Sequence, residues 1–266
     1  MSPTTLPAAV VQMRHRARVE DNLAAAEAHV AAARAAGARL VLLPEYFFAP
    51  EGLRPGPELV EAAAGVRDWL REASTRHGVA LVGTTLEREG DLLRNVGYAF
   101  EEGRLAVRQV KVHPTPGEAK AGIAPGARFE PFTVCGVRAG LLVCADILYP
   151  EAARVLSLQG AELLLNPVMS PYRDVDLTQA ARSALFIARA YDSAAFVLKA
   201  GGFTAARTAV GRSLVAAPWG LLATYRSEWE EELLTATLNF GPLREFRGTH
   251  LAFQGRVPEA YRDLGQ

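Results

Sequence analysis

Short apolar runs alternate with longer amphipathic or alanine-rich segments along most of the chain. The apolar runs have the length of buried strands and are bounded by glycine, proline or charged residues. They predict strands over residues 6–13, 39–44, 79–84, 162–166, 194–200 and 233–239. Further strands are predicted within residues 85–113, within 132–144 with a break at Gly136, and as a hairpin over 211–217 and 220–225.

Helical segments separate many of these strands, and we predict them over residues 22–36, 58–77, 150–158 and 176–190. Gly37 and Gly78 directly follow the first two segments, where glycine commonly ends a helix. Pro150 and Glu151 begin the third, as suits a first helical turn. Strands that alternate with helices are typical of α/β proteins. Because no repeat, low-complexity segment or linker divides the chain, we expect one α/β domain.

The composition is that of a folded globular protein. Of the 266 residues, 50% are hydrophobic and 22% are charged, and the formal net charge is zero. A chain of this length can bury one large core, and its neutrality gives no indication of binding to nucleic acid or to an acidic membrane surface. The apolar runs are too short to span a membrane, and the start of the chain does not resemble a secretory signal. We therefore expect a cytoplasmic protein with no nucleic acid or membrane partner.

The chain has only two cysteines, Cys135 and Cys144. Two cysteines in a chain of this size do not make a disulfide framework, and no Cys/His cluster with metal-binding spacing is present. In a reducing compartment both would be free thiols. We expect no metal and no cofactor.

Three predicted strands end in reactive side chains. Glu45 follows Leu-Leu-Pro, at the carboxyl edge of a sheet where α/β proteins place their sites. Lys111 and His113 lie two apart and should project to the same side, and only three of the 29 basic Lys and Arg residues are lysines, Lys111, Lys120 and Lys199. Cys144 ends the run Ala-Gly-Leu-Leu-Val-Cys. Each alone has an ordinary alternative: a solvated carboxylate, a surface lysine, a small buried thiol. Together they indicate a catalytic site.

With these motifs the chain resembles the nitrilase, or carbon-nitrogen hydrolase, superfamily. The segment from Asn22 to Glu45 resembles the first helix and strand of this superfamily, which end in Pro-Glu. Lys111-Val-His113 resembles the superfamily's catalytic Lys-x-His segment. Cys144-Ala-Asp-Ile-Leu-Tyr-Pro-Glu resembles its nucleophile segment. The resemblance implies a four-layer α-β-β-α sandwich formed by one domain over residues 1–266, with a core of about residues 5–240 and a tail over 241–266. It also implies a homodimer or higher homo-oligomer.

The resemblance carries catalytic roles to Glu45, Lys111, Cys144 and Glu118. Cys144 would be the nucleophile, with the Lys111 cation expected to lower the pKa of its thiol. Lys111 and the backbone N–H of Ala145 would stabilise the oxyanion. Glu45 would move the protons. Glu118, in the loop after His113, resembles the second glutamate of the amidases, which orients the substrate; the alternative is an ordinary loop carboxylate.

Other residues near these motifs receive weaker assignments. Tyr46 follows Glu45 and is a candidate for the wall of a substrate pocket, and Tyr172 and Arg173 lie where the family's substrate-contacting loop often occurs. Asp146 is expected to hold the turn after the nucleophile. His113 is interpreted as structural, since a Cys-His protease reading leaves the glutamate and lysine segments unexplained.

The residues after the nucleophile also bear on the substrate. Nitrilases usually follow the cysteine with an aromatic residue and Glu, whereas this chain has Ala145 and Asp146, which favours an amide or an N-carbamoyl compound over a nitrile. Ile147 and Leu148 replace the arginines of the carbamoyl-D-amino-acid branch. The sequence therefore predicts an enzyme that cleaves a small linear carboxamide, aliphatic or an ω-amide. The alternatives are an N-carbamoyl amidohydrolase, a nitrilase, acyl transfer to an amine, and a non-catalytic binding protein with the same fold.

Overall fold

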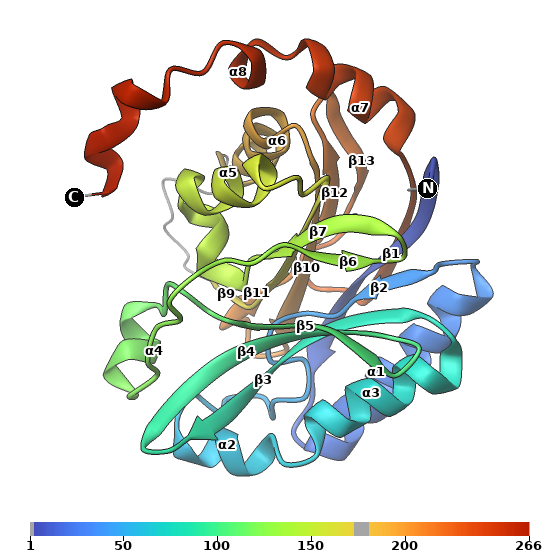
Figure 1. The fold of residues 1–266 in the computed structure, drawn as a ribbon. Coiled ribbons are helices and arrows are strands. Elements are labelled where there is room, and N and C mark those ends of the chain that lie inside the picture. The colour runs from blue at the N-terminus through green and yellow to red at the C-terminus, as the bar shows by residue number, and fades with distance from the viewer. Residues whose placement is uncertain (1–2, 173–180, 266) are drawn as a thin grey trace.

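Two β-sheets lie face to face at the centre of the molecule, and helices cover the outer face of each (Figure 1). The structure is a computed structural model that describes residues 3–172 and 181–265. It has the four α-β-β-α layers and the mixed α/β domain that the sequence predicts. Within the described residues, no helix has the length and apolar character needed to cross a membrane.

The first sheet is built around the long strand β1 (Thr5–His15). β1 pairs in parallel with β2 and antiparallel with β14, and the sheet continues beyond β2 through β3, β4 and β5. The bounds of these strands are β2 (Leu40–Leu42), β3 (Ala80–Glu89), β4 (Leu92–Glu101), β5 (Arg104–Val110) and β14 (Glu232–Asn239).

The second sheet is centred on β10 (Phe196–Thr204), which pairs in parallel with β8 and antiparallel with β12. Its other strands are β6 (Phe132–Val134), β7 (Val137–Leu141), β8 (Leu163–Val168), β12 (Leu214–Ala217) and β13 (Gly220–Thr224). The last residues of β1 and β10 pair in parallel and join the two sheets at one end. A separate two-stranded sheet is formed by β9 (Ser170–Pro171) and β11 (Ala209–Val210).

The helices sort into two outer layers and a C-terminal extension (Figure 1). α1 (Val19–Ala35), α2 (Pro57–Ala62) and α3 (Val66–His77) lie against the first sheet, whereas α5 (Pro150–Leu158) and α6 (Arg182–Ser193) lie against the second. The extension consists of α7 (Phe240–Thr249), α8 (Leu251–Gln254) and the 3-10 helix η3 (Pro258–Gly265). Two short helices, α4 (Pro116–Lys120) and the 3-10 helix η1 (Cys144–Leu148), follow strand ends.

Alternation along the strands explains how three apolar layers form. In β10, Phe196, Leu198 and Ala200 belong to the core between the sheets, whereas Val197 packs against the helices of the outer layer. Successive side chains of a strand point to opposite faces. A strand buried on both faces is therefore mostly apolar, and β10 and β8 are apolar except for Lys199 and Thr204 in β10 and Asn166 in β8.

The structure differs from the predicted elements at three places. The helix predicted over residues 58–77 is two helices, because Gly65 adopts φ 78°, a left-handed conformation that ends the helical path before α3. The strand predicted to end at Cys144 ends at Leu141. The tail is largely helical, because its aromatic and leucine side chains, such as Phe240 and Leu243, find a core to pack against. The start of the helix predicted at residue 176 lies outside the described residues.

Candidate active site

The predicted site residues come from strand ends at one edge of the two sheets. Glu45 follows β2, Lys111 directly follows β5, and Cys144 follows β7. Glu118 belongs to α4, the short helix in the connection after β5. Contacts among these side chains show that the folded chain brings all four together, although they come from both sheets.

Lys111 joins the two glutamates of the site. Its Nζ atom donates to Glu45 Oε1 at 2.8 Å and to Glu118 Oε2 at 2.7 Å. The lysine side chain is 1% exposed, and both carboxylates are also buried. A buried charge is tolerated when it is paired and hydrogen-bonded, so the three groups form one electrostatic unit.

Asn95, which sequence reasoning missed, links the same two carboxylates. Its Nδ2 atom lies 2.8 Å from Glu45 Oε1 and 2.8 Å from Glu118 Oε1. An amide nitrogen has two hydrogens, so one can point to each carboxylate. Asn95 projects from β4, a strand whose sequence shows no reactive pattern. The sequence offers only a weak signal for Asn95, a polar residue inside a mostly buried strand.

Glu118 accepts more hydrogen bonds than Glu45. Besides Lys111 and Asn95, Tyr46 Oη donates to Glu118 Oε1 at 2.9 Å, and the Thr115 N–H and hydroxyl donate to Oε2 at 2.8 and 3.0 Å. The Thr115 contacts form a capping box at the start of α4. This helix cap holds the carboxylate in place, so the alternative of an ordinary loop glutamate does not describe its surroundings.

Cys144 occupies a strained turn between β7 and η1. Its φ is 48°, in the left-handed region that residues other than glycine seldom adopt. The Asn166 amide, at the end of β8, donates to the Cys144 carbonyl oxygen at 3.2 Å and to the Leu142 carbonyl oxygen at 2.5 Å. The turn places the thiol near Glu45, whose charge acts to raise the pKa of the thiol.

The surroundings of Cys144 favour a neutral thiol at rest, although the Lys111 cation acts to lower the pKa of that thiol, as predicted. Burial raises the pKa of the Cys144 thiol well above its ordinary value, and the negative charge of Glu45 adds to the rise. The Lys111 cation acts in the opposite direction but does not outweigh them. The thiol therefore needs a base to remove its proton, and Glu45 is the carboxylate beside it.

The two glutamates have pKa values displaced in opposite directions. Burial raises the pKa of Glu45, with Lys111 opposing the rise. Burial also acts to raise the pKa of Glu118, but the charge and hydrogen bonds of Lys111, Thr115 and Asn95 outweigh it and leave that pKa lowered. For Lys111, burial is outweighed by the carboxylates, so the pKa of its ammonium is raised. Glu118 and Lys111 thus keep their charges, and Glu45 is the group suited to exchange a proton.

Asp146 connects the nucleophile turn to the lysine segment. Its carboxylate is fully buried and accepts from the Val143 N–H at 3.0 Å, from the His113 N–H at 2.8 Å and from His113 Nδ1 at 2.9 Å. The His113 ring also stacks on Tyr149, with centroids 3.6 Å apart. The predicted role of Asp146 in holding the turn is confirmed, and His113 is engaged in structure.

Of the remaining predicted residues, Tyr46 and Ala145 adjoin the site. Tyr46 is 3% exposed and directs its hydroxyl to Glu118, which makes it part of the carboxylate network and leaves little of it to form a pocket wall. Ala145 is the second residue of η1, half-buried beside the nucleophile. Tyr172 packs edge-on against Trp229. Arg173 lies outside the described residues. Cys135 is buried, as predicted for a core residue.

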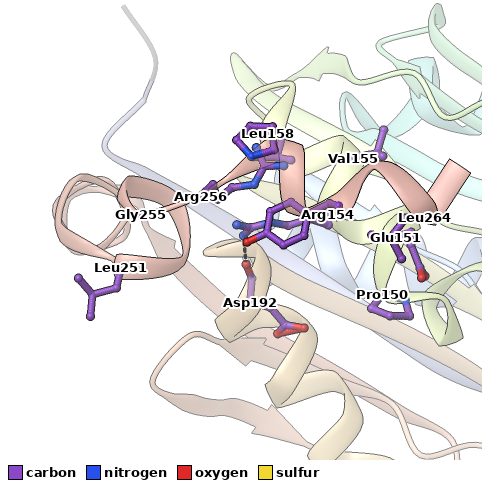
Figure 2. Close-up of a pocket in the computed structure, with 12 residues that line it drawn as sticks. Pro150, Glu151, Arg154, Val155, Leu158, Asp192, Leu251, Gly255, Arg256 and Leu264 are labelled. Carbon is purple, nitrogen blue, oxygen red and sulfur yellow. Dashed lines mark hydrogen bonds between the residues drawn. The ribbon is translucent and has the colours of Figure 1, made fainter.

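A separate groove of about 700 Å³ lies between α5 and the C-terminal extension (Figure 2). Its lining includes Arg154, Leu158, Asp192, Leu251 and Tyr261, and none of the clustered glutamate, lysine and cysteine residues. Within residues 3–172 and 181–265, no group of three or more His, Cys, Asp and Glu side chains could hold a metal ion.

Comparison with known proteins gives matches over most of the chain. Residues 7–248 match the profile of the carbon-nitrogen hydrolase family. The chain is 29% identical to a nitrilase of Pyrococcus abyssi over 95% of this chain and 98% of that protein, and 29% identical to omega-amidase NIT2 of Mus musculus over 92% of each.

Solved structures show the same fold. A carbon-nitrogen hydrolase from Helicobacter pylori superposes with a TM-score of 0.89 at 24% identity, over 98% of this chain and 99% of that one. A mutant amidase from Nesterenkonia sp. AN1, with the acetamide moiety of fluoroacetamide added covalently at its active-site cysteine, superposes with a TM-score of 0.83 at 25% identity, over 99% and 98%. The chain described here therefore belongs to the carbon-nitrogen hydrolase family.

Proposed function

We propose that this protein is a cysteine-dependent amidase that hydrolyses a small linear carboxamide to a carboxylic acid and ammonia. The observation that carries the proposal is the buried cluster in which Lys111 bridges Glu45 and Glu118, beside a thiol on a strained turn. A nucleophile, a base and a fixed cation are the groups that acyl transfer requires.

The first half of the reaction forms a thioester. Glu45 accepts the proton of the Cys144 thiol while the sulfur attacks the amide carbon, so that a C–S bond forms and the carbonyl oxygen becomes an oxyanion. The Lys111 ammonium and the Ala145 N–H stabilise that oxyanion. Glu45 then gives its proton to the nitrogen, the C–N bond breaks, and ammonia leaves.

The second half releases the acid. Glu45 accepts a proton from water, the hydroxide attacks the thioester carbon, and the C–S bond breaks. The proton on Glu45 returns to the sulfur, which restores the resting thiol. Glu118 stays ionised throughout, because its five donors stabilise the charged carboxylate, and it holds Lys111 and the substrate amide in position.

The substrate class follows from the residues after Cys144 and from the relatives. Ala145 and Asp146 favour amides over nitriles, and the comparisons include both an omega-amidase and an amidase. We infer an aliphatic amide or an ω-amide as the first choice. An N-carbamoyl compound is the second choice. Nitriles are also included in the substrate panel, because one relative of this chain is called a nitrilase.

Ammonia release over a panel of aliphatic amides, ω-amides, N-carbamoyl amino acids and nitriles tests the proposal. The wild type should release ammonia from at least one amide, and Cys144→Ala should lower kcat at least about a thousandfold, as expected for loss of a nucleophile. Cys135→Ala, which removes the other thiol, is the matched control and should retain activity. Hydroxylamine added to the reaction should yield hydroxamate if a thioester forms, and acyl transfer to an amine would appear in the same assay.

A non-catalytic binding protein would give a different result. It would release no ammonia from any member of the panel, and iodoacetamide, itself a carboxamide, would alkylate Cys144 no faster than the buried Cys135, whose pKa is raised to about 12 by burial and Glu101. That pair of results would rule out the amidase.

A further inference from the structure

Lys199 is the one buried lysine that the proposed mechanism does not use. It lies in the middle of β10 and is 3% exposed, whereas Lys120 is on the surface. Lysine is seldom fully buried without a charged partner. Its Nζ atom makes one long hydrogen bond, 3.5 Å to the Gly211 carbonyl oxygen, and lies 5.1 Å from the Phe186 ring. Among the described residues, no carboxylate forms an ion pair with it.

The position of Lys199 on the sheet places it beside Asn166. In β10 and β8 these two residues are paired in register, and their strands are parallel neighbours. Leu198 and Leu165, the residues before them, face the core between the sheets. Lys199 and Asn166 must therefore both project to the opposite face, toward α6.

Asn166 connects this face of the sheet to the Cys144 turn through a hydrogen bond. Its Nδ2 atom holds the carbonyl oxygens of Leu142 and Cys144, whereas its Oδ1 atom is buried and has no hydrogen-bond partner in the described part of the chain. An unpaired buried acceptor is costly. Lys199 projects from the paired position on the next strand, and its ammonium has N–H groups for which no described residue provides an acceptor. The Lys199 ammonium is therefore a suitable donor for the unpaired Asn166 Oδ1 atom.

The charged groups around Lys199 are Arg212, Arg182, Glu228 and Cys144. Arg212 is committed to Glu228, with its Nε atom 2.6 Å from the carboxylate. The pKa of Lys199 is lowered to about 7, chiefly by burial; the two arginines contribute to the lowering, whereas a Cys144 thiolate acts to raise it. That coupling is reciprocal: if the thiolate favours the charged lysine, the charged lysine favours the thiolate.

We propose that Lys199 is a positioning residue of the active site, which orients the Asn166 amide toward the Cys144 turn and supplies a second positive charge behind the nucleophile. This inference rests on the proposed amidase function. The proposed effect depends on pH. The Lys199 side chain is protonated and positively charged at pH 6, and it loses this charge as the pH rises through 7. The assistance to thiolate and oxyanion formation should follow that charge.

The test compares kcat/KM of the wild type, Lys199→Met and Lys199→Arg between pH 6 and pH 9. The ratio of the wild-type kcat/KM to that of Lys199→Met should be about tenfold at pH 6, because a charge that lowers the pKa of the Cys144 thiol by about one unit changes the thiolate fraction about tenfold. The ratio should fall severalfold by pH 9, where Lys199 is neutral. Lys199→Arg, charged at every pH, should retain activity at pH 6 and keep a constant ratio to Lys199→Met. Lys120→Met removes a surface lysine and should give a flat ratio near one.

A purely structural lysine would lower kcat/KM by the same factor at every pH, and that result would overturn the proposal. Lys199→Met removes a buried charge that costs free energy to desolvate and keeps a side chain of similar shape, so we expect the variant to fold; thermal unfolding measures this directly.

A second measurement separates this inference from the proposed function. In a Cys135→Ser background, the rate of Cys144 alkylation by iodoacetamide reports thiolate formation without turnover. Lys199→Met should slow alkylation more at pH 6 than at pH 9, even if no substrate in the panel is hydrolysed. Equal slowing at both pH values would refute the role of Lys199 and leave the amidase function intact.

Discussion

At the scale of single residues, two carboxylates of the site are given different protonation behaviour by their hydrogen bonds. Glu118 receives five donors, so its pKa is lowered despite burial, whereas the pKa of Glu45 is raised. Among the residues that the structure describes, Asn95 and Lys111 are the two that donate to both carboxylates. The two hydrogen bonds of Asn95 hold the carboxylates relative to each other, and so bear on the proton transfers that we propose for Glu45.

Asn95→Leu should therefore lower kcat more than it raises KM. Leucine has nearly the same size but offers no donor, so both carboxylates lose a hydrogen bond and Glu45 can shift. A misplacement of this kind costs up to about a hundredfold in rate. Asn95→Asp should be worse, because it adds a third buried carboxylate. Steady-state kinetics check this, and unchanged kcat in a folded Asn95→Leu variant would contradict it.

The sequence predicted four of the clustered residues because strand ends and motif order mark them. Glu45, Lys111 and Cys144 each close an apolar run, and Glu118 follows the lysine motif. Asn95 could not be predicted, since its importance depends on β4 passing between two segments that are distant in sequence. The lowering effect of Lys111 on the Cys144 pKa was predicted, but the net rise was not, because burial and the charge of Glu45, which only the folded chain sets, outweigh it.

At the scale of elements, the site depends on how the Cys144 turn docks against the end of β5. Most strands and helices were predicted near their observed bounds, because apolar periodicity and glycine stops are local signals. Docking is not local: Asp146 of η1 accepts hydrogen bonds from the backbone of Val143 and of His113, two segments that the sequence keeps thirty residues apart. One side chain thus aligns the lysine with the thiol.

Asp146→Ala should both destabilise the protein and lower its activity. Several buried N–H groups lose their acceptor, and each unsatisfied group costs about 1–3 kcal/mol, so we expect a loss of about 2–4 kcal/mol in the free energy of unfolding. Activity should fall even where the variant is fully folded, because the segments that carry Lys111 and Cys144 are no longer held in position relative to each other. Denaturant unfolding and kinetics at low temperature measure the two effects separately.

The matched control is Asp68→Ala, at an exposed carboxylate on α3 with only surface ion pairs. Such pairs contribute about 0–1 kcal/mol, so both properties should change little. If Asp146→Ala were as stable and active as this control, the docking role of Asp146 would be wrong.

At the scale of the whole molecule, several large apolar side chains are exposed on the helices that cover the second sheet. Val155 and Leu158 of α5 and Tyr191 of α6 are exposed, as are Leu251 and Leu264 of the C-terminal extension, which runs beyond α6 (Figure 1). The groove between α5 and the extension is lined in part by the same residues (Figure 2). Contiguous apolar surface of this kind marks an interaction site, and the predicted homodimer would cover it.

We therefore expect the wild type to be a dimer at micromolar concentration by size exclusion with light scattering, joined through this face. Val155→Glu combined with Leu158→Glu should give a monomer, because an isologous interface repeats each substitution and brings four carboxylates together. Leu105→Glu, at an exposed leucine of β5 on the other sheet, is the control and should remain dimeric. A monomeric wild type would exclude the dimer, and a dimeric double variant with unchanged thermal stability would place the interface on another face.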